Sequence, residues 1–120
     1  MATYAKRRLS GSTDGQGIII QTTAATGTLI HTSISGTSAS GSFDEVWVWA
    51  NNTATASKVL GVQWGAKSGE NGVTVRFTLP SRDGAYLIIP GWILQNSRIV
   101  RAFATTTGVV TMHGYVNRIA

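Results

Sequence analysis

The sequence predicts a single-domain, all-β protein whose strands pack as an antiparallel β-sandwich. No stretch of its 120 residues keeps a helical spacing of apolar residues over the eleven or more positions that indicate a helix. Thr and Val, which favour strands, are abundant. Turn-forming residues recur about every 8 to 12 positions, which is typical of a sandwich or a barrel. A chain of this length is expected to form one hydrophobic core.

Eight strands are expected, each bounded by turn residues. The first follows the glycine-rich segment 11–17. Pro80 and Pro90 are expected just beyond strand ends, where a missing N–H does no harm. Asn71-Gly72 predicts a hairpin turn, because both positions tolerate positive φ. The expected strands are 17–23, 28–34, 45–50, 58–64, 73–79, 85–89, 98–104 and 109–119.

The predicted domain organisation is an N-terminal arm and hinge over residues 1–16 and a sandwich over 17–120. Apolar residues alternate with polar ones along 73–79, so one face of that strand is expected to be buried. Segments 18–20 and 46–49 are apolar on both faces, which indicates burial on both sides or contact with a partner. Eight strands in two layers favour a jelly-roll-like sandwich.

Composition restricts the function classes that are open to the chain. Charged residues make up 12%, about half the usual share, so the surface is covered by small polar residues or by a partner. There is no cysteine, which excludes disulfides and thiolate zinc sites. No apolar run approaches the roughly 20 residues of a membrane helix, and no secretory signal pattern is present. Assembly in the cytoplasm is expected.

The net charge of +5 comes from ten basic and five acidic residues. Three of the basic residues are adjacent, at Lys6, Arg7 and Arg8, and the others are scattered along the chain. Such an excess indicates either a solubility charge with one basic arm or an anionic partner such as nucleic acid or an acidic protein surface.

Residues that carry chemistry are few, and the sequence predicts no enzyme. His31 and His113 lie within predicted strands, where a structural role is expected of each. Asp44 and Glu45 are adjacent in a strand, so they face opposite sides and make a poor acid–base pair. Asp14, Glu70 and Asp83 lie in glycine-rich turns that such residues suit. No metal-ligand spacing and no phosphate-binding glycine pattern occurs, so neither a metal nor a cofactor is expected.

Four tryptophans in 120 residues are unusual, and each is open to two interpretations. Trp47 and Trp49 share one face of a strand, where they form either core or an exposed aromatic face able to stack on bases or sugars. Trp92 belongs to an apolar loop with Ile93 and Leu94. That loop either closes one end of the sandwich or contacts a partner.

Four segments together resemble small virion proteins of tailed bacteriophages, of the head decoration or capsid cement type. The resemblance runs along most of the chain, although the motifs describe packing and turns without catalytic content. Its carriers are Ala5-Lys-Arg-Arg-Leu-Ser-Gly-Ser-Thr-Asp-Gly-Gln-Gly-Ile18, Phe43-Asp-Glu-Val-Trp-Val-Trp49, Ile89-Pro-Gly-Trp-Ile-Leu-Gln-Asn96 and Val110-Thr-Met-His-Gly-Tyr-Val-Asn-Arg-Ile119.

The resemblance implies a protein on the surface of the phage capsid that binds the major capsid protein and stabilises the head. It also implies a homo-oligomer, with a trimer favoured over a dimer. The contacts expected with the capsid are the arm (Lys6, Arg7 and Arg8) and the apolar loop (Trp92, Ile93 and Leu94). Deleting residues 1–10 is therefore expected to weaken capsid binding and to leave the free protein's melting temperature nearly unchanged.

Other functions stay open at this point. A neck or tail component, or a fibre-like receptor binder, would use similar sandwiches, and a carbohydrate would be held by Trp47, Trp49 or Trp92. A single-stranded nucleic-acid binder is less favoured. Basic and aromatic residues are not interleaved on one strand face, apart from Arg101 beside Phe103. Binding to a membrane is not expected.

Overall fold

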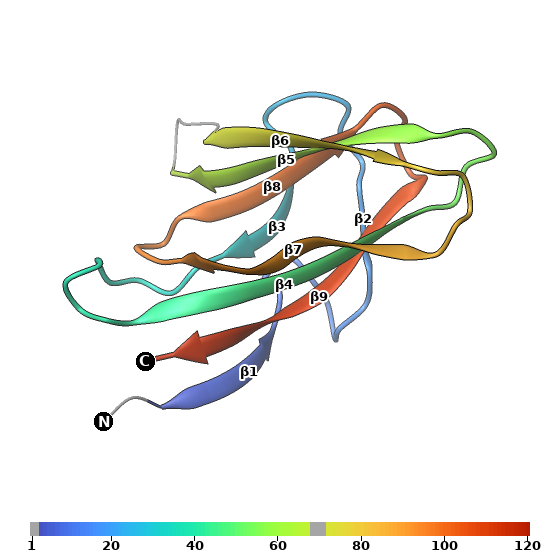
Figure 1. Ribbon diagram of the computed structural model, residues 1–120. Helices are drawn as coiled ribbons and strands as arrows, with labels where there is room; N and C mark the ends of the chain where they lie inside the picture. Colours follow the sequence, from blue (N-terminus) through green and yellow to red (C-terminus); the bar gives the residue numbers. More distant parts are fainter. Residues whose placement is uncertain (1–2, 68–71) are drawn as a thin grey trace.

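The protein, described by a computed structural model over residues 3–67 and 72–120, is a sandwich of two antiparallel sheets without a helix in those residues (Figure 1). The predicted fold class is confirmed. The first sheet holds five strands and the second holds four. The strands are β1 (Tyr4–Arg8), β2 (Ile18–Ile19), β3 (Thr28–Thr32), β4 (Phe43–Asn52), β5 (Lys58–Ala66), β6 (Val73–Leu79), β7 (Ala85–Leu94), β8 (Ile99–Ala104) and β9 (Val110–Ile119).

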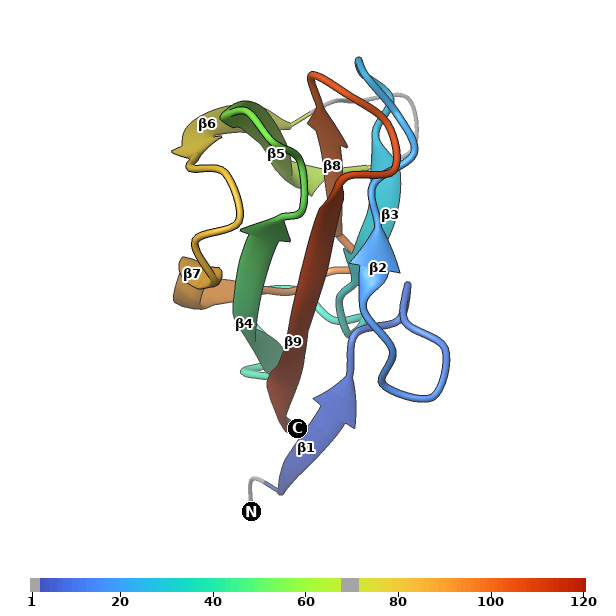
Figure 2. The same cartoon turned by 90° about the vertical axis from the view of Figure 1, so that its right-hand side faces the viewer.

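The strand order is that of a jelly roll. One sheet runs β1-β9-β4-β7, with β2 also paired to β9, and the other runs β3-β8-β5-β6. Apart from the β1–β2 and β5–β6 connections, each connection crosses from one sheet to the other. Figure 2 shows the two layers edge on, with β1 at the end of its sheet beside β9.

The core lies between the sheets because apolar residues recur at every second position of the central strands. In β4, Val46, Val48 and Ala50 are fully buried, while Trp47 and Trp49 face outward. Segment 46–49, predicted to be apolar on both faces, therefore has one face in the core and one partly exposed face. Burial also alternates along segment 18–20, where Ile18 and Ile20 are buried and Ile19 is half exposed.

The prediction that residues 1–16 lie outside the sandwich is wrong for the first part of that segment. Tyr4–Arg8 pair with β9 as strand β1, and Leu9 is only 1% exposed within the core. Beyond Leu9 the chain crosses to the second sheet, where the Gly11 N–H donates to the Ile30 carbonyl at 2.9 Å. The polar sequence Lys6-Arg7-Arg8 hid this strand, because an edge strand tolerates charge on both faces.

The expectation that Trp92, Ile93 and Leu94 form a loop is also corrected. β7 continues through Pro90 to Leu94, and Pro90 pairs with Trp47 across a bulged register. A proline fits here because β7 is an edge strand, so its missing N–H deprives no neighbour of a bond. The first strand is shorter than expected, β4 and β5 are longer, and Asn71 of the predicted hairpin turn lies outside the described residues.

Candidate functional site

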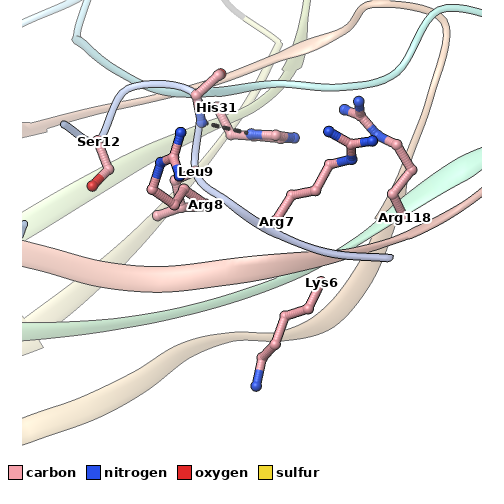
Figure 3. A pocket seen from close by; sticks show the side chains of 8 residues that line it. Lys6, Arg7, Arg8, Leu9, Ser12, His31 and Arg118 are labelled. Atoms are coloured by element: carbon pink, nitrogen blue, oxygen red, sulfur yellow. Dashed lines mark hydrogen bonds between the residues drawn. The ribbon is translucent and has the colours of Figure 1, made fainter. Parts of the chain in front are cut away.

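A basic pocket opens between the edge strands β1 and β3. It has a volume of about 450 Å³, and Figure 3 shows the side chains around it. Three of its cations come from β1, and Arg118 comes from β9, because the antiparallel pairing of these strands sets Ala5 opposite Arg118. The lining residues are Lys6, Arg7, Arg8, Leu9, Ser10, Ser12, His31 and Arg118.

A buried carboxylate links two of the lining residues. Asp44 is fully buried, and its Oδ1 accepts a hydrogen bond from Arg118 Nε at 2.7 Å. Its Oδ2 accepts from Arg118 Nη2 at 2.9 Å and from the Ile34 N–H at 3.1 Å. His31 Nε2 donates to the same Oδ2 at 2.7 Å. Asp44 and Arg118 belong to one sheet and His31 to the other, so the network fastens the sheets together.

The hydrogen bonds assign the tautomer of His31. Its Nδ1 faces the main-chain N–H of Ser10 at 3.0 Å and must accept, so the proton sits on Nε2 and is donated to Asp44. Both ring nitrogens are thus committed to structural bonds. Burial acts to raise the pKa of Asp44, but the hydrogen bonds from Arg118 and His31 outweigh it and hold that pKa well below its ordinary value. Asp44 is therefore a structural anion.

The three cations of β1 point to different sides of the sheet. Arg7 shares a face with Ala5 and Arg118, because side chains alternate along a strand. Figure 3 shows the Arg7 and Arg118 side chains on one side of β1 and Lys6 pointing away from them. Lys6 Nζ lies 4.2 Å from the centroid of the Tyr115 ring on the outer face. Within the described chain, the side chains of Arg7 and Arg8 have no hydrogen-bond or ion-pair partner.

The outer face of the same sheet carries a row of aromatic rings. Trp47 and Trp49 stack at 6.4 Å between centroids, and Trp49 stacks on Tyr115 at 6.1 Å. Trp47 Nε1 donates to Glu45 Oε1 at 2.5 Å. The rings pack against one another, and Trp47 and Trp49 are half buried. Trp47 and Trp49 thus lie on the outer face of the sheet and are only partly exposed.

The three residues of the predicted apolar contact loop separate in the structure. Trp92 packs edge-on against Trp64, with 5.2 Å between ring centroids, and Leu94 is buried in the core. Only Ile93 is well exposed, at 57%. The alternation of β7 causes this, because residues 92 and 94 face the core and residue 93 faces outward. The alternative that this segment closes the sandwich fits Trp92 and Leu94.

The remaining polar candidates lie apart from this pocket. His113 is exposed and bonds to Asn51 at 3.1 Å. Asp14 lies in a turn with a φ of 54°, and Asp83 accepts a hydrogen bond from the Tyr86 hydroxyl, which raises the pKa of that tyrosine. Glu70 lies outside the described residues. No group of three metal-binding side chains occurs among the residues placed by the structure.

Sequence reasoning identified Lys6, Arg7 and Arg8 but missed the pocket they line. It also missed the Asp44–His31–Arg118 network, whose members are far apart in the chain. One signal was present in the sequence: Asp44 occupies the same alternating face as Val46 and Val48, which placed a carboxylate on a buried face and required a cationic partner.

Comparisons with known proteins identify no family for this chain. No protein-family model matches it, and no curated protein matches it. Within residues 3–67 and 72–120, no helix has the length and apolar character needed to cross a membrane.

Proposed function

We propose that this protein is a virion structural protein that binds the major capsid protein of a tailed bacteriophage and decorates and stabilises the head. The proposal begins from the resemblance carried by segments 5–18, 43–49, 89–96 and 110–119. These segments hold most of β1, part of β4, part of β7 and all of β9, and these four strands belong to a single sheet. The resemblance is therefore concentrated in the β1-β9-β4-β7 sheet.

The observation that carries the proposal is the group of aromatic and exposed apolar side chains on the outer face of that sheet. Tyr4 at one edge is 77% exposed, and Leu87 and Ile93 at the other edge are 45% and 57% exposed. The half-buried aromatic row lies between these edges. An aromatic row flanked by exposed apolar side chains, on a chain with few charges, favours contact with a protein partner. The capsid surface is the partner that the resemblance suggests, and a trimer is the oligomer we expect.

The test is to mix the purified protein with heads that lack it. We expect saturable binding and a higher melting temperature of the heads, because a ligand that binds only the assembled state stabilises it. Leu87→Lys with Ile93→Lys is expected to weaken binding at least tenfold. Val73→Lys is the matched control, since Val73 is 66% exposed on the other sheet. Absence of binding by the wild-type protein contradicts the proposal.

A neck, tail or fibre-like receptor-binding role is the second candidate, since the same face would serve there. Electron cryo-microscopy of the particle separates these positions. Saccharide binding receives less support, because Trp47, Trp49 and Tyr115 stack on one another and Lys6 covers Tyr115. Specific binding on a glycan array would instead favour the saccharide-binding role.

A further inference from the structure

We propose that the free edge of β1 binds an extended acidic segment of a partner protein, which adds to the sheet as a further strand. The inference rests on the proposed function, because it assigns this segment to the capsid-side partner. It specifies the chemistry of the contact, namely main-chain hydrogen bonds along β1 and carboxylates opposite Lys6, Arg7 and Arg8.

The first support is an open strand edge. β1 pairs with β9 on one side only and ends the order of its sheet. Thr3 and Ala120 exchange two main-chain hydrogen bonds, at 2.6 and 3.0 Å. In an antiparallel pair such exchanges occur at every second residue, so Ala5 and Arg7 also bond to β9. The N–H and C=O groups of Tyr4, Lys6 and Arg8 therefore point away from the sheet and remain available to a further strand.

The second support is charge. Arg7 lies on the inner side with Arg118, and Arg118 already shares the carboxylate of Asp44. Arg7 therefore borders the pocket as a cation without an anion among the described residues. Lys6 and Arg8 leave β1 towards the outer side, because side chains alternate along a strand. A strand laid along β1 places its side chains on the same alternating sides, so three consecutive acidic residues would meet all three cations.

The edge strand of the second sheet that borders the same pocket is β3. Its free edge is partly covered by other residues of the chain, so a partner strand is expected at β1. The Gly11 N–H donates to the Ile30 carbonyl, and the Thr32 N–H donates to Ser10 Oγ at 2.6 Å. The segment that leaves β1 thus covers part of β3. Charged residues on an edge also protect it against unwanted pairing, which is compatible with a partner that supplies the opposite charge.

Two other occupants fit less well. A second copy of β1 would set three cations against three cations. No strand of this chain supplies three adjacent acids, and Asp44, which adjoins Glu45, is buried. A nucleic acid would meet Lys6 and Arg8 on one side of the sheet or Arg7 on the other, and its backbone lacks the alternating donors and acceptors that the edge can pair with.

The test uses three labelled ten-residue peptides and measures fluorescence anisotropy with the full-length protein. All alternate threonine and valine at their ends. The first has three central glutamates, the second has three lysines, and the third repeats the first with N-methylated amides at alternate positions. We expect only the first to bind, with the amide protons of Tyr4, Lys6 and Arg8 becoming protected from exchange. N-methylation is expected to weaken binding at least tenfold, although charge is unchanged.

A protein variant tests the cations. Lys6→Gln, Arg7→Gln and Arg8→Gln together are expected to weaken peptide binding about tenfold, since each exposed ion pair contributes modestly. Lys58→Gln, which removes one cation from the other sheet, is the control and is expected to leave binding unchanged. A melting curve shows whether each variant is folded. The N-methylated peptide, used with wild-type protein, keeps the test decisive if the triple variant unfolds.

Each alternative result overturns the inference. Equal binding of the first and third peptides indicates charge attraction without strand addition. If no peptide binds, β1 is not a peptide-binding edge. A labelled thymidine oligonucleotide is measured in the same assay, and if it binds at β1 more tightly than the first peptide, the edge is assigned to nucleic acid. If wild-type protein binds heads while the peptides fail, only this inference is lost. If wild-type protein does not bind heads, the proposed function is lost, whatever the peptides do.

Discussion

His31 Nδ1 accepts a hydrogen bond from the main-chain N–H of Ser10 at 3.0 Å, while its Nε2 donates to Asp44. One imidazole therefore joins the segment after β1, the edge of the second sheet and a buried carboxylate of the first. The basic edge is held in place by this contact, so the stability of the fold and the geometry of the proposed binding edge depend on the same few bonds.

Replacement of Asp44 by alanine is expected to lower the free energy of unfolding by about 3 kcal/mol. The change leaves Arg118 and His31 without their acceptor at a largely buried position, which costs more than a surface pair. Chemical denaturation measures the loss. Asp14→Asn is the control, because Asp14 is exposed and asparagine tolerates its positive φ. A loss under about 1 kcal/mol for Asp44→Ala would contradict the structural role of the network.

Stability is expected to fall in acid through Asp44. Its pKa in the folded protein lies below its ordinary value, so between those two values the unfolded chain binds more protons. The stabilisation is therefore fully present above about pH 4 to 5 and is lost as the pH falls towards the folded pKa. Melting temperatures from pH 6 to pH 2 measure this, and Asp44→Asn should show a flatter profile. Parallel profiles would show that other carboxylates cause the acid sensitivity.

Deletion of residues 1–10 is expected to destabilise the free protein strongly, which reverses the expectation drawn from the sequence. It removes β1, the buried Leu9 and the bond from Ser10 to His31. Leu9→Ala alone is expected to cost about 3 kcal/mol, as large-to-small changes in a core do. Lys6→Ala, in the deleted segment but exposed, is the control. An unchanged melting temperature after the deletion would show that β1 is dispensable to the fold.

Replacement by alanine is expected to destabilise the protein at Trp92 but hardly at its neighbour Ile93. Trp92→Ala removes the edge-on contact with Trp64 and should lower the free energy of unfolding by about 2 kcal/mol. Ile93→Ala should change it by less than about 0.5 kcal/mol, because the side chain is mostly exposed. Thermal denaturation of both variants measures the contrast. Equal losses would place Ile93 in the packed core.

Several strands were predictable because their own residues specify them. β6 alternates from Val73 to Leu79 and has the predicted bounds, whereas β1 has no apolar alternation and was predicted as an arm. Its strand conformation depends on pairing with β9, which lies more than a hundred residues away in sequence. Pro90 was likewise predicted to end a strand, and only its position at the sheet edge makes it tolerable within β7.

For the candidate site as well, some features were predictable from the sequence and others were not. The sequence by itself determined the all-β class, the low charge and the cluster Lys6-Arg7-Arg8, because composition and local alternation are properties of neighbouring residues. Only the tertiary structure decided that this cluster forms a sheet edge, that Arg7 and Arg118 border one pocket, and that Asp44 lies beneath His31 and Arg118. These relationships require strand order and register, which arise from long-range packing and hydrogen bonds between segments that no local pattern connects.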